Sequence, residues 1–235
     1  MKRLGFSVSA LVLGALSLGL ISGCNVSNDN INEIRIRLVN VNPDGPTKEV
    51  RINDELIEAA LNYGDVGNFG SARSGVFRID VRPISTTTAQ ISEDLNAQSP
   101  ESHTVLIVGR KLTTPVLQFL NLLDDRNQPG SGRGRLRVVN AAATLSTVDV
   151  YITGANDPIS SAIRIYQDVP FAGVADYFEY PAGSYRVQVT NANDPNVVMD
   201  SGAIDVGSKE IRTMIIMDAK GAGAPYQNLI LHDLN

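Results

Sequence analysis

The chain has 235 residues, a formal net charge of −5, one Cys, two His and no Trp, and 43% of its residues are hydrophobic. The acidic balance argues against a nucleic-acid-binding protein, because such proteins need clustered positive charge. A single Cys excludes both an intrachain disulfide and a zinc site built from several thiolates. The hydrophobic content is too high for a wholly disordered chain, so one large or two small folded domains are expected.

The first 24 residues have the pattern of an export signal. Lys2 and Arg3 precede an uncharged, largely apolar run that ends in Ile21-Ser22-Gly23-Cys24. A positive start, an apolar stretch and small residues are typical of a secretory signal. The last four residues resemble the lipobox of bacterial lipoproteins, which implies cleavage between Gly23 and Cys24 and lipidation of Cys24. A plain signal peptide and an uncleaved membrane helix are the alternatives.

The lipobox resemblance implies a mature cell-envelope lipoprotein that begins at Cys24. Acyl chains such as palmitate contribute about 0.8 kcal/mol per buried CH₂, so they anchor a protein firmly in the membrane. In proteobacterial lipoproteins an Asp after the Cys favours the inner membrane. Asn25 stands there in this chain, which implies sorting to the outer membrane. Residues 1–23 are thus the expected signal peptide, and residues 24–32 the lipidated Cys and a polar tether.

The remaining sequence contains one pattern written twice. RIRLVN at 35–40 recurs as RLRVVN at 135–140, an offset of 100, and residues 75–81 recur as 183–189, an offset of 108. Residues 63–66 align with 166–169 at an offset of 103, and residues 104–108 with 213–217 at an offset of 109. This order of matches predicts a duplication. Module 1 is expected at 33–124, a flexible linker at 125–133 and module 2 at 134–235.

Both modules are expected to consist of β-strands. Apolar and polar residues alternate at 34–38, 77–82, 148–152 and 185–190, which is the period of half-buried antiparallel strands. Residues 105–108 and 214–217 are apolar on both faces, so they are expected to be central strands covered by the core and by a loop or the neighbouring module. The predicted fold class is all-β, with two tandem immunoglobulin-like antiparallel β-sandwich domains of seven strands each.

Two segments and the relation between the modules stay open. Residues 55–61 and 160–166 are expected to form either single turns or edge strands. The linker is short enough for the modules to pack together, but its composition is that of a flexible segment.

Several strings resemble a known family. RLRVVNA, VDVYI and YPAGSYRVQV, followed by an apolar strand near residue 214, resemble domain-of-unknown-function family 4397, an uncharacterised bacterial family. The resemblance covers residues 134–233 and, more loosely, 33–123. It implies small β-sandwich modules, often in tandem, on lipoproteins and on secreted or surface proteins. Because the family has no assigned activity, it implies no functional residue.

Three groups of polar residues are candidates for chemistry. His103 and His232 have no nucleophile or orienting partner nearby in the sequence, so they are expected to be surface histidines. Acidic loops at 44, 124–125, 157 and 191–194 lack the spacing of a calcium loop, so turn formation is the plainer interpretation. Five arginines of module 1 are expected to project into solvent as an ion-paired sheet face, with a phosphate-binding or lipopolysaccharide-binding face as the alternative: Arg35, Arg37, Arg51, Arg78 and Arg82.

The fourth group is aromatic. Tyr177, Phe178 and Tyr180 lie before the turn at 181–183, and Tyr185 follows it. Packing in the core or in the turn is the plainer interpretation, and Tyr185 is expected in the core with a backbone hydrogen bond resembling a tyrosine corner. An exposed aromatic row could instead bind sugar rings or a protein, so Tyr177, Phe178 and Tyr180 are the candidate binding residues.

The functional expectation follows from these groups. The sequence predicts no catalytic residue, no metal site and no cofactor. It favours a non-enzymatic lipoprotein that acts as a structural or protein-interaction module, with a carbohydrate-binding lipoprotein as the alternative. The expected partners are the membrane, through the lipid anchor, and an unknown envelope protein or glycan, but no nucleic acid.

Overall fold

The computed structural model describes residues 32–234. The predicted signal peptide, with Gly23, Cys24 and Asn25, lies outside this range. The strands follow one another in this order: β1 (Glu33–Asn40), β2 (Lys48–Ile52), β3 (Glu55–Leu61), β4 (Gly70–Arg73), β5 (Gly75–Pro83), β6 (Ile91–Ala97), β7 (Ser102–Val108), β8 (Gln118–Leu123), β9 (Arg133–Asn140), β10 (Thr147–Gly154), β11 (Ile163–Pro170), β12 (Gly173–Pro181), β13 (Gly183–Asn191), β14 (Val197–Val206), β15 (Ile211–Met217) and β16 (Gln227–His232). A turn of 3-10 helix, η1 (Ile159–Ser161), lies between β10 and β11. Within residues 32–234, no helix is long and apolar enough to span a membrane.

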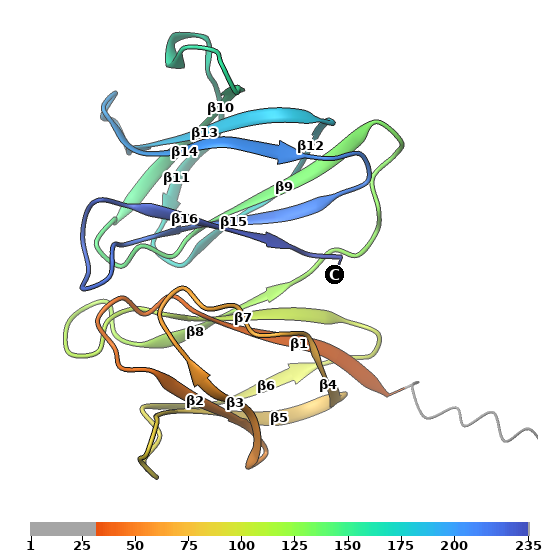
Figure 1. Cartoon of the computed structure of the whole chain (residues 1–235), viewed down its shortest axis with the longest axis vertical. Coiled ribbons are helices and arrows are strands. Elements are labelled where there is room, and N and C mark those ends of the chain that lie inside the picture. The colour runs from red at the N-terminus through yellow and green to blue at the C-terminus, as the bar shows by residue number, and fades with distance from the viewer. Residues whose placement is uncertain (1–31, 235) are drawn as a thin grey trace, which may run out of the picture. The chain divides into compact units, whose positions relative to one another are not determined.

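The strands form two sandwiches of two sheets each (Figure 1). We call β1–β8 the first repeat, with sheets β4-β1-β7-β8 and β3-β2-β5-β6. We call β9–β16 the second repeat, with sheets β12-β9-β15-β16 and β11-β10-β13-β14. The same topology therefore occurs twice, and the predicted all-β sandwich fold is confirmed.

Two details of the sandwiches differ from the prediction. Each repeat has eight strands rather than seven, and the pairs β1–β7 and β9–β15 are parallel rather than antiparallel. The short strand β4 consists of Gly-Ser-Ala-Arg, which has no apolar alternation to reveal it. Residues 55–61 form the edge strand β3, so the edge-strand alternative holds for that segment. Residues 160–166 combine both alternatives, because 160–161 lie in the turn η1 and 163–166 begin the edge strand β11.

Each repeat has a separate apolar core between its two sheets. Ile34, Ile36 and Leu38 on β1 are each 1% exposed and pack with Val105 and Ile107 of β7. The alternation in β1 thus places every second side chain inside, as the period of two predicts. Full burial of such a side chain stabilises the fold by roughly 1.5–3 kcal/mol. The second repeat has an equivalent core around Val148, Val150 and Met214.

The β2–β3 and β10–β11 hairpins show how the repeats correspond. Ile52 pairs with Glu55, and Ile152 pairs with Ile163, so the offset changes from 100 to 108 within this one turn. The second repeat carries η1 there. This insertion sets the offset of 108 as far as β5 and β13, and one further residue at the register shift in β14 makes the offset 109 for β7 and β15.

The predicted match of residues 63–66 with 166–169 is therefore wrong. The amide of Gly64 donates to Asn40 O and the amide of Ala172 donates to Asn140 O, both at 2.8 Å. Tyr63 consequently corresponds to Phe171 rather than to Tyr166. The strings YGDV and YQDV are similar, but YQDV begins at Tyr166, five residues before Phe171, the true counterpart of Tyr63.

A third apolar cluster joins the two repeats. It contains outer-face residues of the central strands and their neighbours: Val39, Val41, Leu106, Val108, Leu122, Val139, Ala141, Ile215, Met217 and Leu231. The central strands 105–108 and 214–217 are thus each covered on one face by their own core and on the other face by the other sandwich. This confirms the prediction drawn from their apolar composition and answers the open question of whether the modules pack together.

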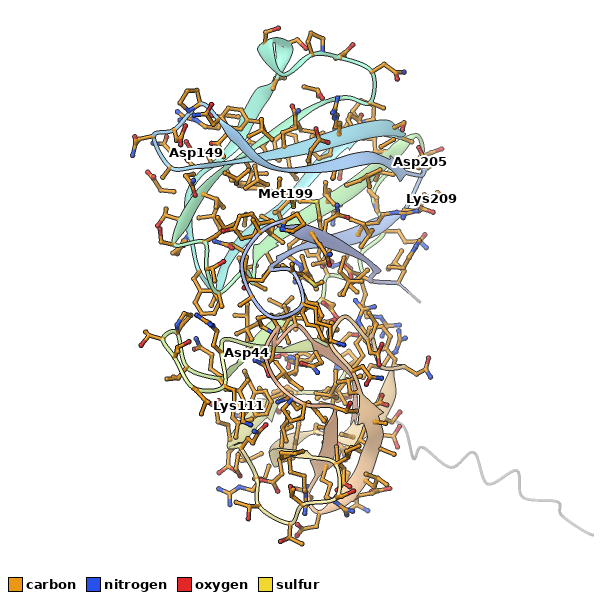
Figure 2. The ribbon with its side chains drawn as sticks, turned by 60° about the vertical axis from the view of Figure 1, so that its left-hand side comes forward. Asp44, Lys111, Asp149, Met199, Asp205 and Lys209 are labelled. Atoms are coloured by element: carbon orange, nitrogen blue, oxygen red, sulfur yellow. The ribbon has the colours of Figure 1, made fainter. Side chains whose placement is uncertain are left out.

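Lys48 is an unexpected buried cation in the first repeat. Its side chain is fully buried, and its Nζ donates to Gln90 Oε1 at 2.8 Å. Asp44 and Lys111 lie beside each other (Figure 2), and the Lys111 amide donates to Asp44 Oδ1 at 2.9 Å. Burial, and to a smaller extent Lys111, lowers the pKa of Lys48 to about 8, against a partial rise caused by Asp44.

This lowered pKa predicts a distinctive pH dependence of stability. Above pH 8 the folded chain releases the Lys48 proton while the unfolded chain keeps it, so the free energy of unfolding rises with pH, by about 1 kcal/mol per pH unit at most. Lys48→Met removes the titrating group and should remove this rise. Urea unfolding of both proteins from pH 7 to about 9 measures the difference, and equal slopes would contradict the assignment.

Candidate functional site

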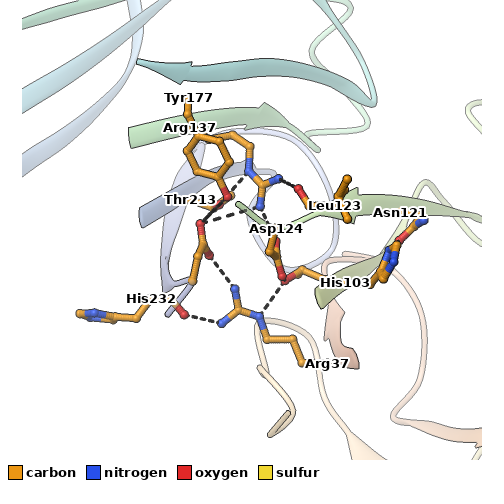
Figure 3. A network of polar contacts seen from close by, with 11 residues as sticks. Arg37, His103, Asn121, Leu123, Asp124, Arg137, Tyr177, Thr213 and His232 are labelled. Carbon is orange, nitrogen blue, oxygen red and sulfur yellow. Dashed lines mark hydrogen bonds and ion pairs between the residues drawn. The ribbon is translucent and has the colours of Figure 1, made fainter. Parts of the chain in front are cut away.

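A network of buried polar side chains joins the two repeats (Figure 3). On β9, Arg137 donates from Nε to the Thr213 hydroxyl at 2.9 Å. From Nη1 it donates to the Leu123 carbonyl at 2.9 Å, and from Nη2 to Asp124 Oδ1 at 2.6 Å. Because Leu123 is the last residue of β8 in the first repeat and Asp124 follows it, this guanidinium binds across the interface.

Arg37 on β1 makes the reciprocal set of bonds. Its Nε donates to the Thr104 hydroxyl at 2.8 Å, within its own repeat. Its Nη1 donates to the His232 carbonyl at 2.8 Å and its Nη2 to Asp233 Oδ1 at 2.7 Å, both at the end of the second repeat. Each repeat therefore contributes one arginine and accepts one from the other, as in an isologous dimer interface.

The two threonines complete the network. The Thr104 hydroxyl donates to Asp124 Oδ2 at 2.7 Å, and the Thr213 hydroxyl donates to Asp233 Oδ2 at 2.6 Å. Both oxygens of the Asp124 carboxylate and both of the Asp233 carboxylate thus accept hydrogen bonds. Burial raises the pKa of Asp124 above its ordinary value, although attraction to Arg137 opposes that rise.

The prediction of an exposed arginine face is wrong for Arg37, which is only 5% exposed. It holds in full for Arg78, which is exposed and lies 3.2 Å from Asp94. Arg51 and Arg82 are ion-paired as predicted, 2.6 and 3.4 Å from Glu49, but both are partly buried. Alternation placed Arg37 on the outer face of its sheet, but the second repeat covers that face. The signal that could have found it is the recurrence of Arg, Thr and Asp at matching places in both repeats.

The histidines are placed differently from one another. His232 is exposed, as predicted, but His103 is 4% exposed, so its assignment as a surface histidine is wrong. The ring of His103 lies 3.0 Å from Asn121 Oδ1 and 3.2 Å from Glu101 Oε2. The backbone amide of Gln98 and, next, His103 lower the pKa of Glu101. These bonds hold β7 to its neighbours.

Tyr177 belongs to the interface and not to an exposed aromatic row. Its hydroxyl donates to Asp233 Oδ2 at 2.8 Å, and its ring centroid lies 4.5 Å from Arg137 Cζ. Burial and then the Asp233 charge hold the pKa of Tyr177 well above its ordinary range. Phe69 takes the equivalent place in the first repeat, with its ring 4.5 Å from Arg37 Cζ.

The other two aromatic candidates line a cavity of 310 Å³ at the opposite side of β12. Phe178 is 46% exposed, and its ring lies 4.4 Å from that of Tyr180. Tyr185 lies 5.2 Å from Tyr180 and donates its hydroxyl to Pro181 O at 2.6 Å, which confirms the predicted backbone bond. Within the described residues, the buried Tyr180 hydroxyl and Thr153 Oγ1 have no hydrogen-bond partner.

The acidic loops contain turn-forming side chains. Asp194 Oδ1 accepts from the Asn196 amide at 2.9 Å, and Asp125 Oδ1 accepts from the Asn127 amide at 2.8 Å. Residues 32–234 contain no group of three or more His, Cys, Asp or Glu side chains placed to hold a metal ion.

The segment predicted to be a flexible linker is bound to the second repeat, because Arg135 Nη1 donates to Asp125 Oδ2 at 2.5 Å.

These features define a protein of two sandwich repeats joined by a reciprocal buried ion-pair network. The model of the family described as "Domain of unknown function (DUF4397)" matches residues 34–151. The chain belongs to this family, which confirms the resemblance seen in the sequence. The matched residues cover the first repeat and extend into β10. No protein of curated function matches the chain in sequence.

Solved structures give only distant similarities. The Bacillus anthracis TIE protein is 14% identical over 81% of this chain and 34% of its own, with a TM-score of 0.26, so the chain spans about a third of that protein. A family 26 carbohydrate-binding module from Eubacterium rectale Amy13K, solved with maltoheptaose, is 10% identical over 85% and 96%, with a TM-score of 0.27. A streptococcal virulence factor that binds α-glucan is 8% identical over 73% and 87%, with a TM-score of 0.25. These scores are too low to carry an argument.

Proposed function

We propose that this protein is a non-enzymatic lipoprotein of the bacterial cell envelope, more specifically of the outer membrane, and acts as a structural and protein-interaction module. The observation that carries the proposal is the saturated network between the repeats. Its arginines, aspartates and threonines bind one another, so they fix the two sandwiches together. A general base or nucleophile needs a free atom facing a substrate, and these groups have none.

The lipid anchor is the part of the proposal that one substitution can test. Cys24→Ser replaces the sulfur that the acyl donor must reach, so the precursor should stay unacylated and keep residues 1–23. Labelling with a radioactive fatty acid, combined with gel mobility of the product, measures both effects. Ser27→Ala, just beyond the lipobox, is the matched control and should mature normally. Normal acylation and processing of Cys24→Ser would refute the anchor.

The absence of catalysis is tested on the same purified protein. A broad panel of hydrolase substrates should show no turnover above that of a heat-denatured sample. Turnover that one point substitution in the described residues abolishes would overturn the proposed function.

The aromatic cavity supports a second candidate function, binding of a glycan. Its unpartnered Tyr180 hydroxyl and Thr153 Oγ1 are polar groups that a sugar hydroxyl could satisfy, and the exposed ring of Phe178 could stack on the sugar. Glycan-array and peptidoglycan pull-down signals should fall on Phe178→Ala if this function is correct. Val197→Ala, at another exposed apolar side chain, is the control. Signals that Phe178→Ala leaves unchanged would exclude this cavity.

A further inference from the structure

Two cavities flank the network, and the repeat relates them to each other. One of 650 Å³ is lined by Arg137, Tyr177 and the end of β8. The other, of 520 Å³, is lined by Arg37, Phe69 and the end of β16, which are the corresponding places. We call the second one the Arg35 cavity, because Arg35 also lines it.

The two cavities differ in the acidic partners of one arginine. Arg135, in the second repeat, lies 3.1 Å from Glu179 Oε2 and 2.5 Å from Asp125 Oδ2. Glu179 is its cross-strand neighbour on β12. Hydrogen bonds from Arg133 and then Arg135 lower the pKa of Glu179, as expected for a bound carboxylate.

Arg35 is the counterpart of Arg135, but both carboxylates are replaced. Its cross-strand neighbour on β4 is Ser71, where the second repeat has Glu179. Leu234 follows Asp233, where Asp125 follows Asp124. Among residues 32–234, no carboxylate forms an ion pair with Arg35.

The surroundings of Arg35 hold its side chain in place and put two other arginines near it. Its Cζ lies 4.3 Å from the centroid of Phe69, on which Arg37 also stacks. Burial, and then the charges of Arg126 and Arg37, lower the pKa of Arg35, and the charge of Asp124 opposes this to a smaller extent. His232 and Asn68 also line the cavity, whose described lining has no acidic side chain. An anion in the cavity would relieve this repulsion and complete a site that the second repeat fills internally.

We propose that the Arg35 cavity binds a carboxylate side chain of an acidic peptide from a partner protein. The equivalent arginine holds a segment of this chain in that way, because Arg135 Nη1 donates both to Asp125 Oδ2 and to the Asn127 carbonyl at 3.1 Å. The side chain and the main chain of one segment are thus held together. The inference rests on the proposed protein-interaction function and names the chemistry of the partner.

The test uses the full-length lipidated protein in detergent and a fluorescein-labelled peptide of alternating Asp and Gly, with fluorescence anisotropy as the readout. The wild-type protein should bind the Asp peptide and not the same peptide with Asn. Arg35→Gln should raise the Kd roughly tenfold or more, about 1.4 kcal/mol. Arg78→Gln, at an exposed arginine, is the matched control and should leave the Kd unchanged.

A second variant keeps the test independent of any loss of folding in Arg35→Gln. Ser71→Glu places a carboxylate beside Arg35, as Glu179 stands beside Arg135, so it should occupy the site and abolish peptide binding. No binding by the wild-type protein, equal binding by Ser71→Glu, or tighter binding of oligogalacturonate than of the Asp peptide would each overturn the inference. These results leave the proposed function standing, since acylation and turnover test it separately.

Discussion

Replacing Asp233 by asparagine is expected to lower the free energy of unfolding by about 3–5 kcal/mol, because it leaves the buried Arg37 guanidinium without its charge partner. Asp233 is fully buried and accepts from Arg37 on Oδ1 and from Thr213 and Tyr177 on Oδ2. An amide at this position must direct its NH₂ at one of those donors. The melting temperature should fall on the order of 10 °C, given about 2–4 °C per kcal/mol for a protein of this size.

Urea unfolding of the wild-type and variant proteins measures this effect. Asp94→Asn is the matched control, since Asp94 pairs with Arg78 at the surface, where both side chains are more than half exposed, and an exposed pair contributes about 0–1 kcal/mol. The double substitution Arg37→Met and Asp233→Leu removes both charges and should recover much of the loss. A loss below about 1 kcal/mol for Asp233→Asn would show that the network does not hold the repeats together.

Local sequence patterns predicted most of the strands and the duplication, but not the short strand β4. Alternation in β1, β5, β10 and β13 reports which face of a strand is buried, because successive side chains point to opposite faces. Residues 105–108 and 214–217 have no polar face, so both faces of each strand were expected to be covered. The other repeat covers the outer face in each case. Fold class could therefore be read from residues close together in the sequence.

The candidate site depended on contacts that no local pattern contains. Arg37 and Asp233 are 196 residues apart, and a charged residue on an alternating strand normally faces water. Only the docking of a second sandwich turns that face into an interface. The place of Tyr177 could not be predicted for the same reason: it packs between the repeats, whereas its neighbours Phe178 and Tyr180 line a separate cavity on the other side of β12.

The missing contacts were nevertheless encoded in the duplication. Arg37 and Arg137, Thr104 and Thr213, and the paired aspartates at the ends of β8 and β16 are polar residues repeated among apolar ones. A single module gives no reason for such repetition. A reciprocal interface does, because each side then needs the same donor and the same acceptor.

The apolar part of that interface leads to the second large effect. Ile215 is fully buried in the apolar cluster that both repeats share. Ile215→Asp therefore buries a carboxylate among apolar side chains, which should lower the free energy of unfolding by several kcal/mol. The wild-type chain is expected to unfold in one cooperative transition. The variant is expected to unfold in two, with the second repeat melting first because β15 is one of its inner strands.

Differential scanning calorimetry distinguishes loss of coupling from general destabilisation. Ile163→Asp makes the same chemical change at an isoleucine that is 68% exposed on the edge strand β11, so it should keep a single transition and change the free energy of unfolding by less than about 0.5 kcal/mol. Each repeat has its own core, so the first can stay folded after the second has melted. One transition in Ile215→Asp, shifted no more than in Ile163→Asp, would mean that the shared cluster does not couple the two sandwiches.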